Sequence, residues 1–240
     1  MEFRKLSIIM PVFNEQNTIK TILGKVLSVK LPVAKEIIIV NDGSTDNSEA
    51  IILEFMKRHH KSEIKYFKKQ NGGKGSAIRL GFSKATGDII TVQDADLEYE
   101  PEDFKRLLQP IVNNETKAVY GSRYIGKEGY FKSKHHIWYF VHLLGNWGLS
   151  LITSIVFFTK ITDMETCYKM FTREVMKGLE LKSDGFGIEP EITAKILRRG
   201  YKIKEIRINY KSRDFSEGKK ITWRDGLKAF GYLLYFRVFD

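Results

Sequence analysis

The sequence feature that most constrains the fold is a series of short apolar runs that alternate with helical repeats. The runs at 6–10, 36–40, 64–67 and 88–92 are rich in Ile, Val or aromatic residues, and they are too short for helices. Between the first two runs, apolar side chains in 19–27 recur with helical spacing. Strands that alternate with helices in this way form βαβ units. The sequence therefore predicts an α/β domain with a doubly wound, mostly parallel sheet.

Acidic side chains follow three of the predicted strands. Glu15 comes after the first strand, Asp42 after the second, and Asp94 and Asp96 after the fourth. Ligands of open α/β sheets bind outside the carboxyl ends of the strands, so these positions are functional candidates. An Asp-x-Asp pair there offers oxygen ligands to Mg²⁺ or Mn²⁺, with other coordination positions left for a diphosphate. The alternative is structural: Asp94 would cap a turn, and Asp96 would cap the next helix, whose start is indicated by Pro101.

Two common nucleotide-binding classes are disfavoured. The segment 72–76, Gly-Gly-Lys-Gly-Ser, lacks P-loop spacing, because Lys68 occupies the place of the first glycine. Gly75 also follows the lysine where a P-loop needs Ser or Thr to hold Mg²⁺. The turn after the first strand has no Gly-x-Gly-x-x-Gly, which argues against a dinucleotide-binding dehydrogenase.

Composition limits the compartment and the possible partners. The chain has 240 residues, 42% of them hydrophobic, and its single Cys167 excludes an internal disulfide or a cysteine-rich metal site. Residues 1–5 lead directly into a strand without a secretory signal, which predicts a cytoplasmic protein. The net charge is +11, and 195–240 contains thirteen basic against five acidic side chains. This gradient favours a polyanionic partner, such as nucleic acid, an anionic membrane surface or substrate phosphates.

Four motifs, in order and spacing, resemble those of family 2 glycosyltransferases with the GT-A fold. They are 11–15 (Pro-Val-Phe-Asn-Glu), 40–46 (Val-Asn-Asp-Gly-Ser-Thr-Asp), 71–75 (Asn-Gly-Gly-Lys-Gly) and 94–96 (Asp-Ala-Asp). The chain is most similar to the polyprenyl-phosphate sugar transferases, a group that includes dolichol-phosphate mannose synthase. Each motif alone is weak, but the ordered set is specific.

The resemblance implies a binding site for a nucleotide-sugar donor. Asp42 would hydrogen-bond the nucleobase, and Pro11 and Glu15 would shape the base and ribose pocket. Asp94 and Asp96 would face the ribose and the diphosphate, with Mg²⁺ or Mn²⁺ as cofactor. The full set of implied donor-binding residues is Pro11, Val12, Asn14, Glu15, Asp42, Lys74, Gln93, Asp94, Ala95 and Asp96.

The resemblance extends to the acceptor side of the sugar. Gly-Ser-Arg-Tyr at 121–124 ends a predicted strand and would place Arg123 near the acceptor phosphate. Asp163 and Glu189 would lie near the sugar or acceptor. Arg213 and Lys219, in a basic loop that could also be merely solvated, would neutralise the diphosphate and the acceptor phosphate. The implied catalytic set is Asp96, Asp163, Glu189, Arg213 and Lys219.

Two acids near these positions have simpler interpretations. Glu165 lies just ahead of a predicted strand and is expected to cap a turn. Glu191 lies in the first turn of a predicted helix, where it favours the positive end of the helix dipole.

Two apolar segments predict contact with a membrane. The segment 137–158 is long enough to cross a bilayer, but His142, Asn146 and two glycines argue against a simple span. We expect helices that lie against the catalytic domain and partly in the membrane interface; a buried helical hairpin is the alternative. The segment 223–240 is expected to form an amphipathic interfacial helix next to the membrane.

These expectations combine into one prediction of architecture and activity. Residues 1–222 would form a Rossmann-like GT-A catalytic domain, with a sugar-nucleotide half up to 123 and an acceptor half from 124. The enzyme would move a hexose, with inversion, from a UDP- or GDP-sugar to a dolichyl or undecaprenyl monophosphate at the cytoplasmic face of the membrane. One alternative is a family 2 transferase with a saccharide or other hydroxyl acceptor, in which Asp163 or Glu189 would be the base. The other alternative is a non-catalytic binding module. Nucleic acid is not expected as a partner, because carboxylates at three strand ends would repel its phosphates.

Overall fold

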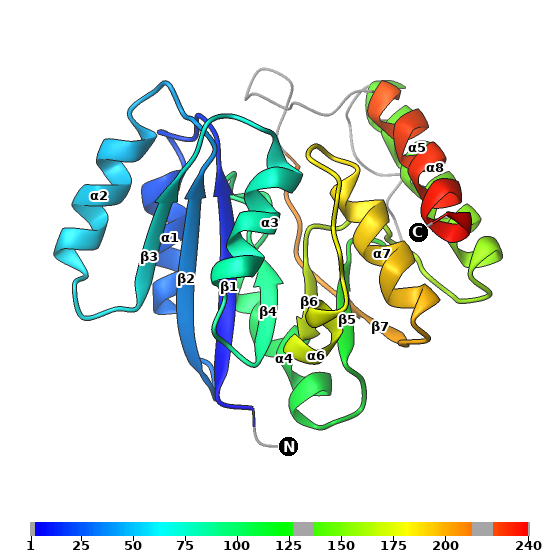
Figure 1. The fold of residues 1–240 in the computed structure, drawn as a ribbon, viewed down its shortest axis with the longest axis horizontal. Helices are drawn as coiled ribbons and strands as arrows, with labels where there is room; N and C mark the ends of the chain where they lie inside the picture. The colour runs from blue at the N-terminus through cyan, green and yellow to red at the C-terminus, as the bar shows by residue number, and fades with distance from the viewer. Residues whose placement is uncertain (1–2, 127–136, 213–222, 240) are drawn as a thin grey trace.

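A seven-stranded mixed sheet forms the centre of the molecule (Figure 1). The computed structural model describes residues 3–126, 137–212 and 223–239. The strands lie in the order β3-β2-β1-β4-β6-β5-β7. Their bounds are β1 Lys5–Val12, β2 Ala34–Asn41, β3 Ile64–Lys68, β4 Ile89–Val92, β5 Ala118–Ser122, β6 Lys169–Thr172 and β7 Ile203–Arg207.

The first four strands form the predicted parallel half of the sheet. β1 pairs in parallel with β2 on one side and with β4 on the other, and β2 pairs with β3. β1 and β2 are buried over most of their length, because helices cover both of their faces. The carboxyl ends of β1, β2 and β4 therefore lie at one edge, which is the upper edge in Figure 1.

The second half of the sheet is mixed. β6 runs antiparallel between β4 and β5, and β5 pairs in parallel with β7. The segment 118–124 was predicted as a strand that ends in an arginine; β5 stops at Ser122, and Arg123 follows it. The sheet as a whole confirms the doubly wound α/β prediction, with the antiparallel β6 inserted.

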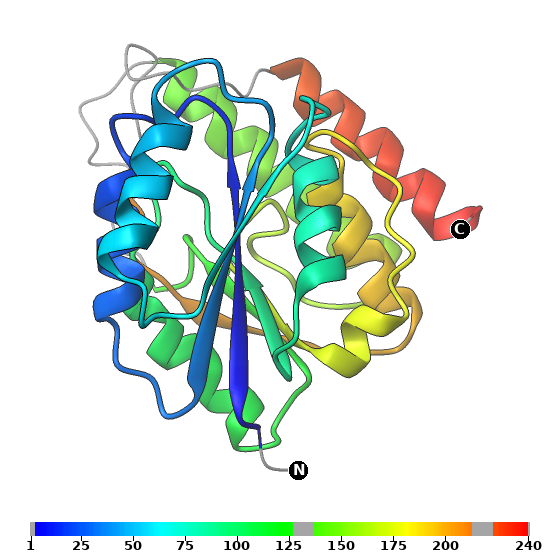
Figure 2. The same cartoon turned by 60° about the vertical axis from the view of Figure 1, so that its left-hand side comes forward.

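Helices cover both faces of the sheet, as Figure 2 shows in an edge view. α1, α2 and α4 lie on one face, and α3, α6 and α7 lie on the other. The bounds are α1 Ile19–Ser28, α2 Ser48–Arg58, α3 Lys74–Lys84, η1 Pro101–Asp103, α4 Phe104–Val112, α6 Arg173–Lys177 and α7 Ile188–Arg198. Burial follows the amphipathic pattern, for example at Ile19, Ile22, Leu23 and Val26 of α1.

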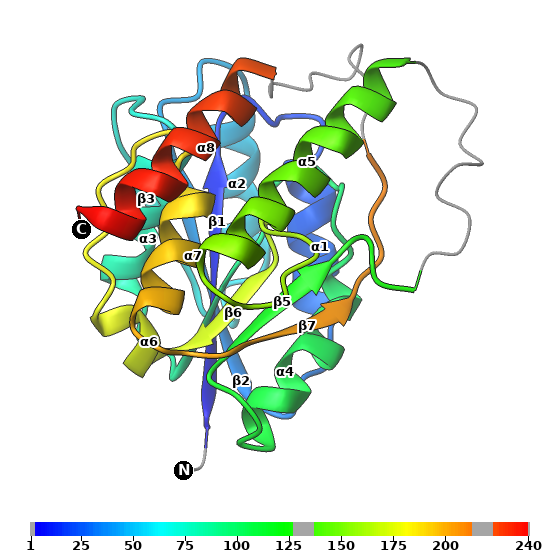
Figure 3. The ribbon, with the colours of Figure 1, turned by 90° about the vertical axis from the view of Figure 1, so that its right-hand side faces the viewer.

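Two further helices, α5 (Ile137–Val156) and α8 (Trp223–Val238), pack side by side outside α7 (Figure 3). A small second core, including Leu149, Met164 and Leu233, joins them to the domain. Within the described part of the chain, neither helix nor any other is long and apolar enough to cross a membrane. α5 is one continuous helix and not a hairpin.

The pair α5–α8 exposes many large apolar side chains. On α5, Trp147 is 62% and Ile155 63% exposed. On α8, Phe230 and Leu234 are exposed, whereas Ala229, Leu233 and Phe236 are buried. We refer to these exposed side chains, together with Leu151, Phe158, Tyr232, Tyr235 and Phe239, as the apolar surface.

Candidate active site

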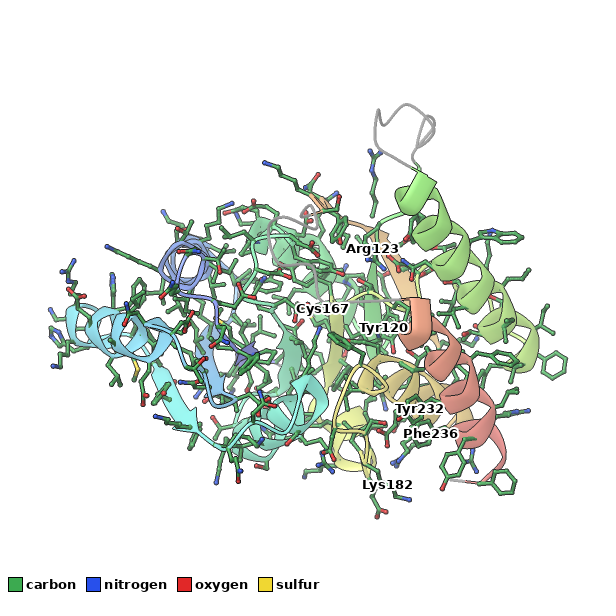
Figure 4. All side chains as sticks on the ribbon, turned by 90° about the horizontal axis from the view of Figure 1, so that it is seen from above. Tyr120, Arg123, Cys167, Lys182, Tyr232 and Phe236 are labelled. Carbon is green, nitrogen blue, oxygen red and sulfur yellow. The ribbon has the colours of Figure 1, made fainter. Side chains whose placement is uncertain are left out.

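A cavity of about 420 Å³ lies at the carboxyl edge of the parallel strands. Figure 4 views the molecule from this edge and labels two lining residues, Arg123 and Cys167. The predicted site residues that line the cavity are Pro11, Val12, Glu15, Asp42, Lys74, Asp94, Ala95, Asp96, Arg123 and Glu189. The remaining lining residues are Phe13, Asn71, Gly73, Ala77, Glu98, Tyr99, Asn146, Glu165, Cys167, Phe186 and Tyr210.

Asp42, at the end of β2, holds the glycine loop before α3. Its Oδ1 accepts hydrogen bonds from Gly72 N (3.0 Å) and Lys69 Nζ (2.7 Å), and its Oδ2 accepts from Gly73 N (2.7 Å). Gly73 has a φ of +93°, and a Cβ there would meet the carbonyl oxygen of Asp184. The carboxylate therefore orders the loop against the cavity, and it retains part of its acceptor capacity for a ligand.

Asn14 fastens the loop after β1 to the loop after β2. It adopts a left-handed conformation with φ +56°, its N–H donates to Ser44 Oγ (3.0 Å), and its Oδ1 accepts from Thr45 N (2.8 Å). Asn14 is not part of the cavity lining. Because its polar groups serve these contacts, Asn14 holds the two loops together and does not face the cavity.

A chain of alternating charges runs from the donor side to the acceptor side. Lys74 Nζ, at the start of α3, lies 2.8 Å from Asp94 Oδ1, 2.9 Å from Asp94 Oδ2 and 3.5 Å from Glu189 Oε1. Glu189 Oε2 accepts a 2.5 Å bond from Lys169 Nζ, which is buried and also donates to the carbonyls of Met164 and Thr166. Burial alone would lower the pKa of Lys74, but Asp94, together with Cys167 and Glu189, raises it well above its usual value. Lys74 is therefore a fixed cation at the cavity wall.

Gln93 supports the Asp-x-Asp turn from below. It is fully buried, its Nε2 donates to the carbonyl of Asp94 (3.0 Å), and its Oε1 accepts from Tyr168 OH (2.6 Å). Gln93 does not line the cavity, and the two ends of its amide bond the Asp-x-Asp turn and Tyr168, the residue just before β6. Asp96 does line it, and its Oδ1 accepts a hydrogen bond from Glu98 N (3.2 Å).

Arg123 is held by a buried bidentate ion pair. Its Nε and Nη2 donate to Asp163 Oδ2 and Oδ1, both at 2.7 Å, and its backbone N also donates to Oδ2. Glu205 of β7 in turn accepts from the backbone N–H groups of Thr162 and Asp163. The rings of Tyr124 and Tyr210 lie 5.5 and 5.0 Å from the guanidinium carbon.

The ion pair sets Asp163 back from the cavity. Its side chain is fully buried, and both of its oxygens are occupied by Arg123. In this geometry the carboxylate positions the arginine, and the arginine is the group that reaches the cavity. Arg213 and Lys219, the other predicted cations, lie outside the described residues.

Glu165 is a lining residue that the sequence interpretation missed. Its Oε1 is buried and has no hydrogen-bond partner. Burial raises the pKa of Glu165 to about 7; Lys169 and Arg123 oppose the rise, and Glu189 and Asp163 add to it. The available signal was its place two residues after Asp163, which the resemblance put near the sugar or acceptor.

A divalent cation fits this site only in combination with a ligand. Among the described residues, no group of three or more His, Cys, Asp or Glu side chains could hold a metal ion. Asp94 is paired with Lys74, which leaves Asp96 as the carboxylate best suited to a cation. Mg²⁺ is commonly bound by one or two carboxylates and substrate phosphates, so this donor set suits a metal that arrives with a diphosphate.

Comparisons with other sequences identify relatives that act on lipid phosphates. The chain is 31% identical over 194 residues to a dolichol-phosphate mannosyltransferase from Pyrococcus furiosus, covering 80% of this chain and 53% of that one. It is 35% identical over 111 residues to an undecaprenyl-phosphate 4-deoxy-4-formamido-L-arabinose transferase from Sodalis glossinidius, covering 45% and 34%. The chain thus spans about half the length of the first relative.

Comparison with solved structures shows the fold. Glucosyl-3-phosphoglycerate synthase from Mycobacterium tuberculosis, in complex with Mn²⁺, UDP and phosphoglyceric acid, superposes with a TM-score of 0.74 at 16% identity, over 99% of this chain and 80% of that one. The same synthase with Mg²⁺ and UDP gives a TM-score of 0.66 at 18% identity, over 97% and 79%. The architecture is the GT-A fold that the motifs predicted. Residues 7–179 match the family model named Glycosyl transferase family 2, and the chain belongs to that family.

Proposed function

We propose that this chain transfers a hexose, with inversion, from a UDP- or GDP-sugar to a polyprenyl monophosphate. The observation that carries the proposal is the continuity of one cavity between the two halves of the domain. Asp42, Lys74 and Asp96 line it on the donor side, Arg123 lines it on the acceptor side, and Asn146 of α5 also reaches it. A lipid phosphate that approaches along the apolar surface would therefore meet the donor in the same cavity.

The donor side suits a nucleoside diphosphate. Asp42 lines the cavity and would hydrogen-bond the nucleobase, and Lys74, at the N-terminus of α3, adds a fixed positive charge for the diphosphate. Asp96 would hold Mg²⁺ or Mn²⁺ together with the diphosphate oxygens, as the relatives' fold and the donor set suggest. A bound cation would stabilise the charge on the leaving nucleoside diphosphate. Lys74, together with Arg213 and Lys219 outside the described residues, would add to that stabilisation.

The acceptor side suits a lipid phosphate. Arg123 would orient the phosphate, because Asp163 and two tyrosine rings fix its guanidinium before any ligand arrives. The attacking phosphate oxygen would approach the anomeric carbon from the face opposite the diphosphate, which gives inversion. The apolar surface of α5–α8 would rest in the membrane interface at the cytoplasmic face, where a polyprenyl phosphate is presented.

A second candidate is a family 2 transferase with a hydroxyl acceptor. The carboxylates on the acceptor side of the cavity favour this candidate. A hydroxyl acceptor needs a base to remove its proton, whereas a phosphate monoester is already largely ionised at neutral pH. The acceptor assay below separates the two candidates.

The testing experiment is a transfer assay with purified protein. UDP- and GDP-hexoses are incubated with Mg²⁺ or Mn²⁺, with and without a short polyprenyl phosphate, and lipid-linked sugar is measured. We expect lipid-linked product with one donor. Slow donor hydrolysis without lipid product, or product with a soluble saccharide alone, would contradict the lipid acceptor.

The variant Asp96→Ala tests the donor site. We expect at least about a 100-fold loss of transfer, because stabilisation of the leaving diphosphate is lost. The matched control is Glu54→Ala on α2, an exposed acid that pairs with Arg58 far from the cavity. Near wild-type transfer by Asp96→Ala would contradict the assignment of Asp96.

A further inference from the structure

Glu165 stands out among the acids of the cavity because of its unused oxygen. It lies in the connection between α5 and β6, it lines the cavity, and its buried Oε1 has no hydrogen-bond partner. An unpaired buried carboxyl oxygen is costly, so Glu165 Oε1 is available to a partner that enters the cavity with the substrate.

The other described carboxylates of the cavity already have protein partners. Examples are the hydrogen bonds from Thr18 to Glu15 and from Tyr210 to Glu98, and the ion pair of Asp94 with Lys74. The acids that line the cavity and accept such contacts are Glu15, Asp42, Asp94, Asp96, Glu98 and Glu189. Asp163 and Glu189, the bases expected from the sequence, are bound by Arg123 and Lys169. A carboxylate held by a cation is a weaker proton acceptor than one without such a contact.

Glu165 also lies on the acceptor side. The charged groups that act on it are Lys169 and Glu189 from β6 and α7, and Arg123 and Asp163 from the ion pair at the end of β5. Two are positive and two are negative, so their effects on the carboxyl group largely oppose one another. Burial then dominates, and the pKa of Glu165 rises to about 7.

We propose that Glu165 is the proton acceptor of the transfer reaction. This rests on the proposed transferase function and deepens it. The acceptor oxygen forms a bond to the anomeric carbon as the bond from that carbon to the nucleoside diphosphate breaks, and the diphosphate leaves with the electron pair. The proton of the acceptor oxygen passes to the Glu165 carboxylate. It is released to water after the products leave.

The chemistry of the acceptor matches this role. A phosphate monoester loses its second proton near pH 6, so a fraction of it arrives protonated at neutral pH. A carboxylate with a similar pKa can take that proton, and proton transfer is most effective when the base titrates near the working pH. The same carboxylate can take a proton from water, which links Glu165 to slow hydrolysis of the donor as well.

The experiment compares Glu165→Gln, Glu165→Asp and the wild type in transfer and in donor hydrolysis from pH 5 to 9. In donor hydrolysis only the ionised carboxylate accepts a proton, so the wild-type rate should rise about tenfold per pH unit below pH 7 and level off above it. In transfer the wild-type rate should pass through a maximum between about pH 6 and pH 7, because the lipid phosphate loses the proton that it gives to Glu165 as pH rises past 6. Glu165→Gln should lose about 100- to 10,000-fold and show no inflection near pH 7. Glu165→Asp should restore part of the rate, and the nucleoside diphosphate Kd should stay within about twofold of wild type in both variants.

The control is Glu174→Gln, an exposed acid of α6 that pairs with Lys117. Wild-type transfer with an unchanged rate and pH profile in Glu165→Gln would overturn the Glu165 proposal alone. Donor hydrolysis without lipid product, still dependent on Glu165, would overturn the lipid acceptor and retain Glu165. A wild-type protein that turns over neither lipid phosphate nor water would overturn both.

Discussion

Glu36, at the edge of the sheet opposite the cavity, shows how a single buried carboxylate joins three segments of the parallel half. It is fully buried, and it accepts from Ser7 Oγ (2.5 Å), Thr86 N (2.6 Å), Gly87 N (3.1 Å) and Lys65 Nζ (2.6 Å). Burial by itself would raise the pKa of Glu36, but the hydrogen bonds from Lys65, Ser7 and Thr86 lower it far below the usual value. The ionised carboxylate therefore stabilises the fold.

The sign of this pKa shift predicts how stability depends on pH. Because the folded pKa is depressed, the contribution is present above the unfolded pKa of 4.5 and is lost as pH falls toward the folded pKa. Glu36→Gln should lower the free energy of unfolding by about 2–4 kcal/mol at pH 7, and this difference should shrink below pH 4.5. Urea unfolding at pH 7 and pH 3.5 measures it, with Glu54→Gln as an exposed control that should change little. Equal stability of Glu36→Gln and wild type at pH 7 would contradict the argument.

The sequence predicted those candidate site residues whose positions are determined by the ends of strands. Pro11, Asp42 and Asp96 were predicted correctly as neighbours at one edge, because the carboxyl ends of parallel strands meet there. Glu165 was missed because its local sequence suits a turn, and the environment on which its proposed role rests is created by groups from distant elements. Asp163 was placed near the sugar, and local sequence carries no information that Arg123 would occupy its carboxylate.

At the scale of elements, the N-terminus of α3 is packed directly against the loop before α7. Ser76 N donates to the carbonyl of Asp184 (3.0 Å). A Cβ at Gly75 would collide with the carbonyl of Ser183 and lie 2.9 Å from the carbonyl carbon of Asp184. This contact sets the position of Lys74 relative to Phe186 and Glu189, all of which line the cavity.

The space around two glycines predicts opposite effects of Gly→Ala substitutions on the free energy of unfolding. Gly75→Ala should lower the free energy of unfolding by about 1–3 kcal/mol, because backbone must move, and it should weaken nucleotide binding. Gly24→Ala, inside α1 where a Cβ meets nothing within 4 Å, should raise it by about 0.5–1 kcal/mol. Urea unfolding and nucleotide titration of both variants check this. An unchanged free energy of unfolding in Gly75→Ala would contradict this prediction, because it would show that the loop before α7 can move without loss of stability.

The order of the elements was less predictable than their existence. β1, β2, β3 and β4 were predicted at the observed places, because each has a local apolar signal and a helical connection that forces parallel pairing. The insertion of β6 between β4 and β5 depends on pairing between segments far apart in the sequence. No local pattern encodes that choice.

At the scale of the whole molecule, the cavity and the apolar surface adjoin through α5. Asn146 of α5 lines the cavity and donates to Tyr124 OH (2.9 Å). One position further along, Trp147 begins a stripe with Leu151 and Ile155, four residues apart, that is exposed on one face of α5. A net charge of +11 adds attraction to an anionic surface. Apolar contact and charge should therefore act together when the protein meets a membrane.

This arrangement predicts binding to anionic vesicles. The protein should sediment with vesicles of phosphatidylglycerol and phosphatidylcholine more than with phosphatidylcholine alone, and salt should weaken the difference. Burying one large apolar side chain is worth about 1.5–3 kcal/mol, so the double variant Trp147→Ser, Ile155→Ser should partition at least about tenfold less. Its nucleotide affinity should not change. The matched control is Leu53→Ser, an exposed leucine of α2, and α2 lies at the opposite end of the molecule from α5 and α8 (Figure 1). Equal sedimentation of the double variant and the control would place the membrane contact elsewhere, because α5 would then contribute nothing to it.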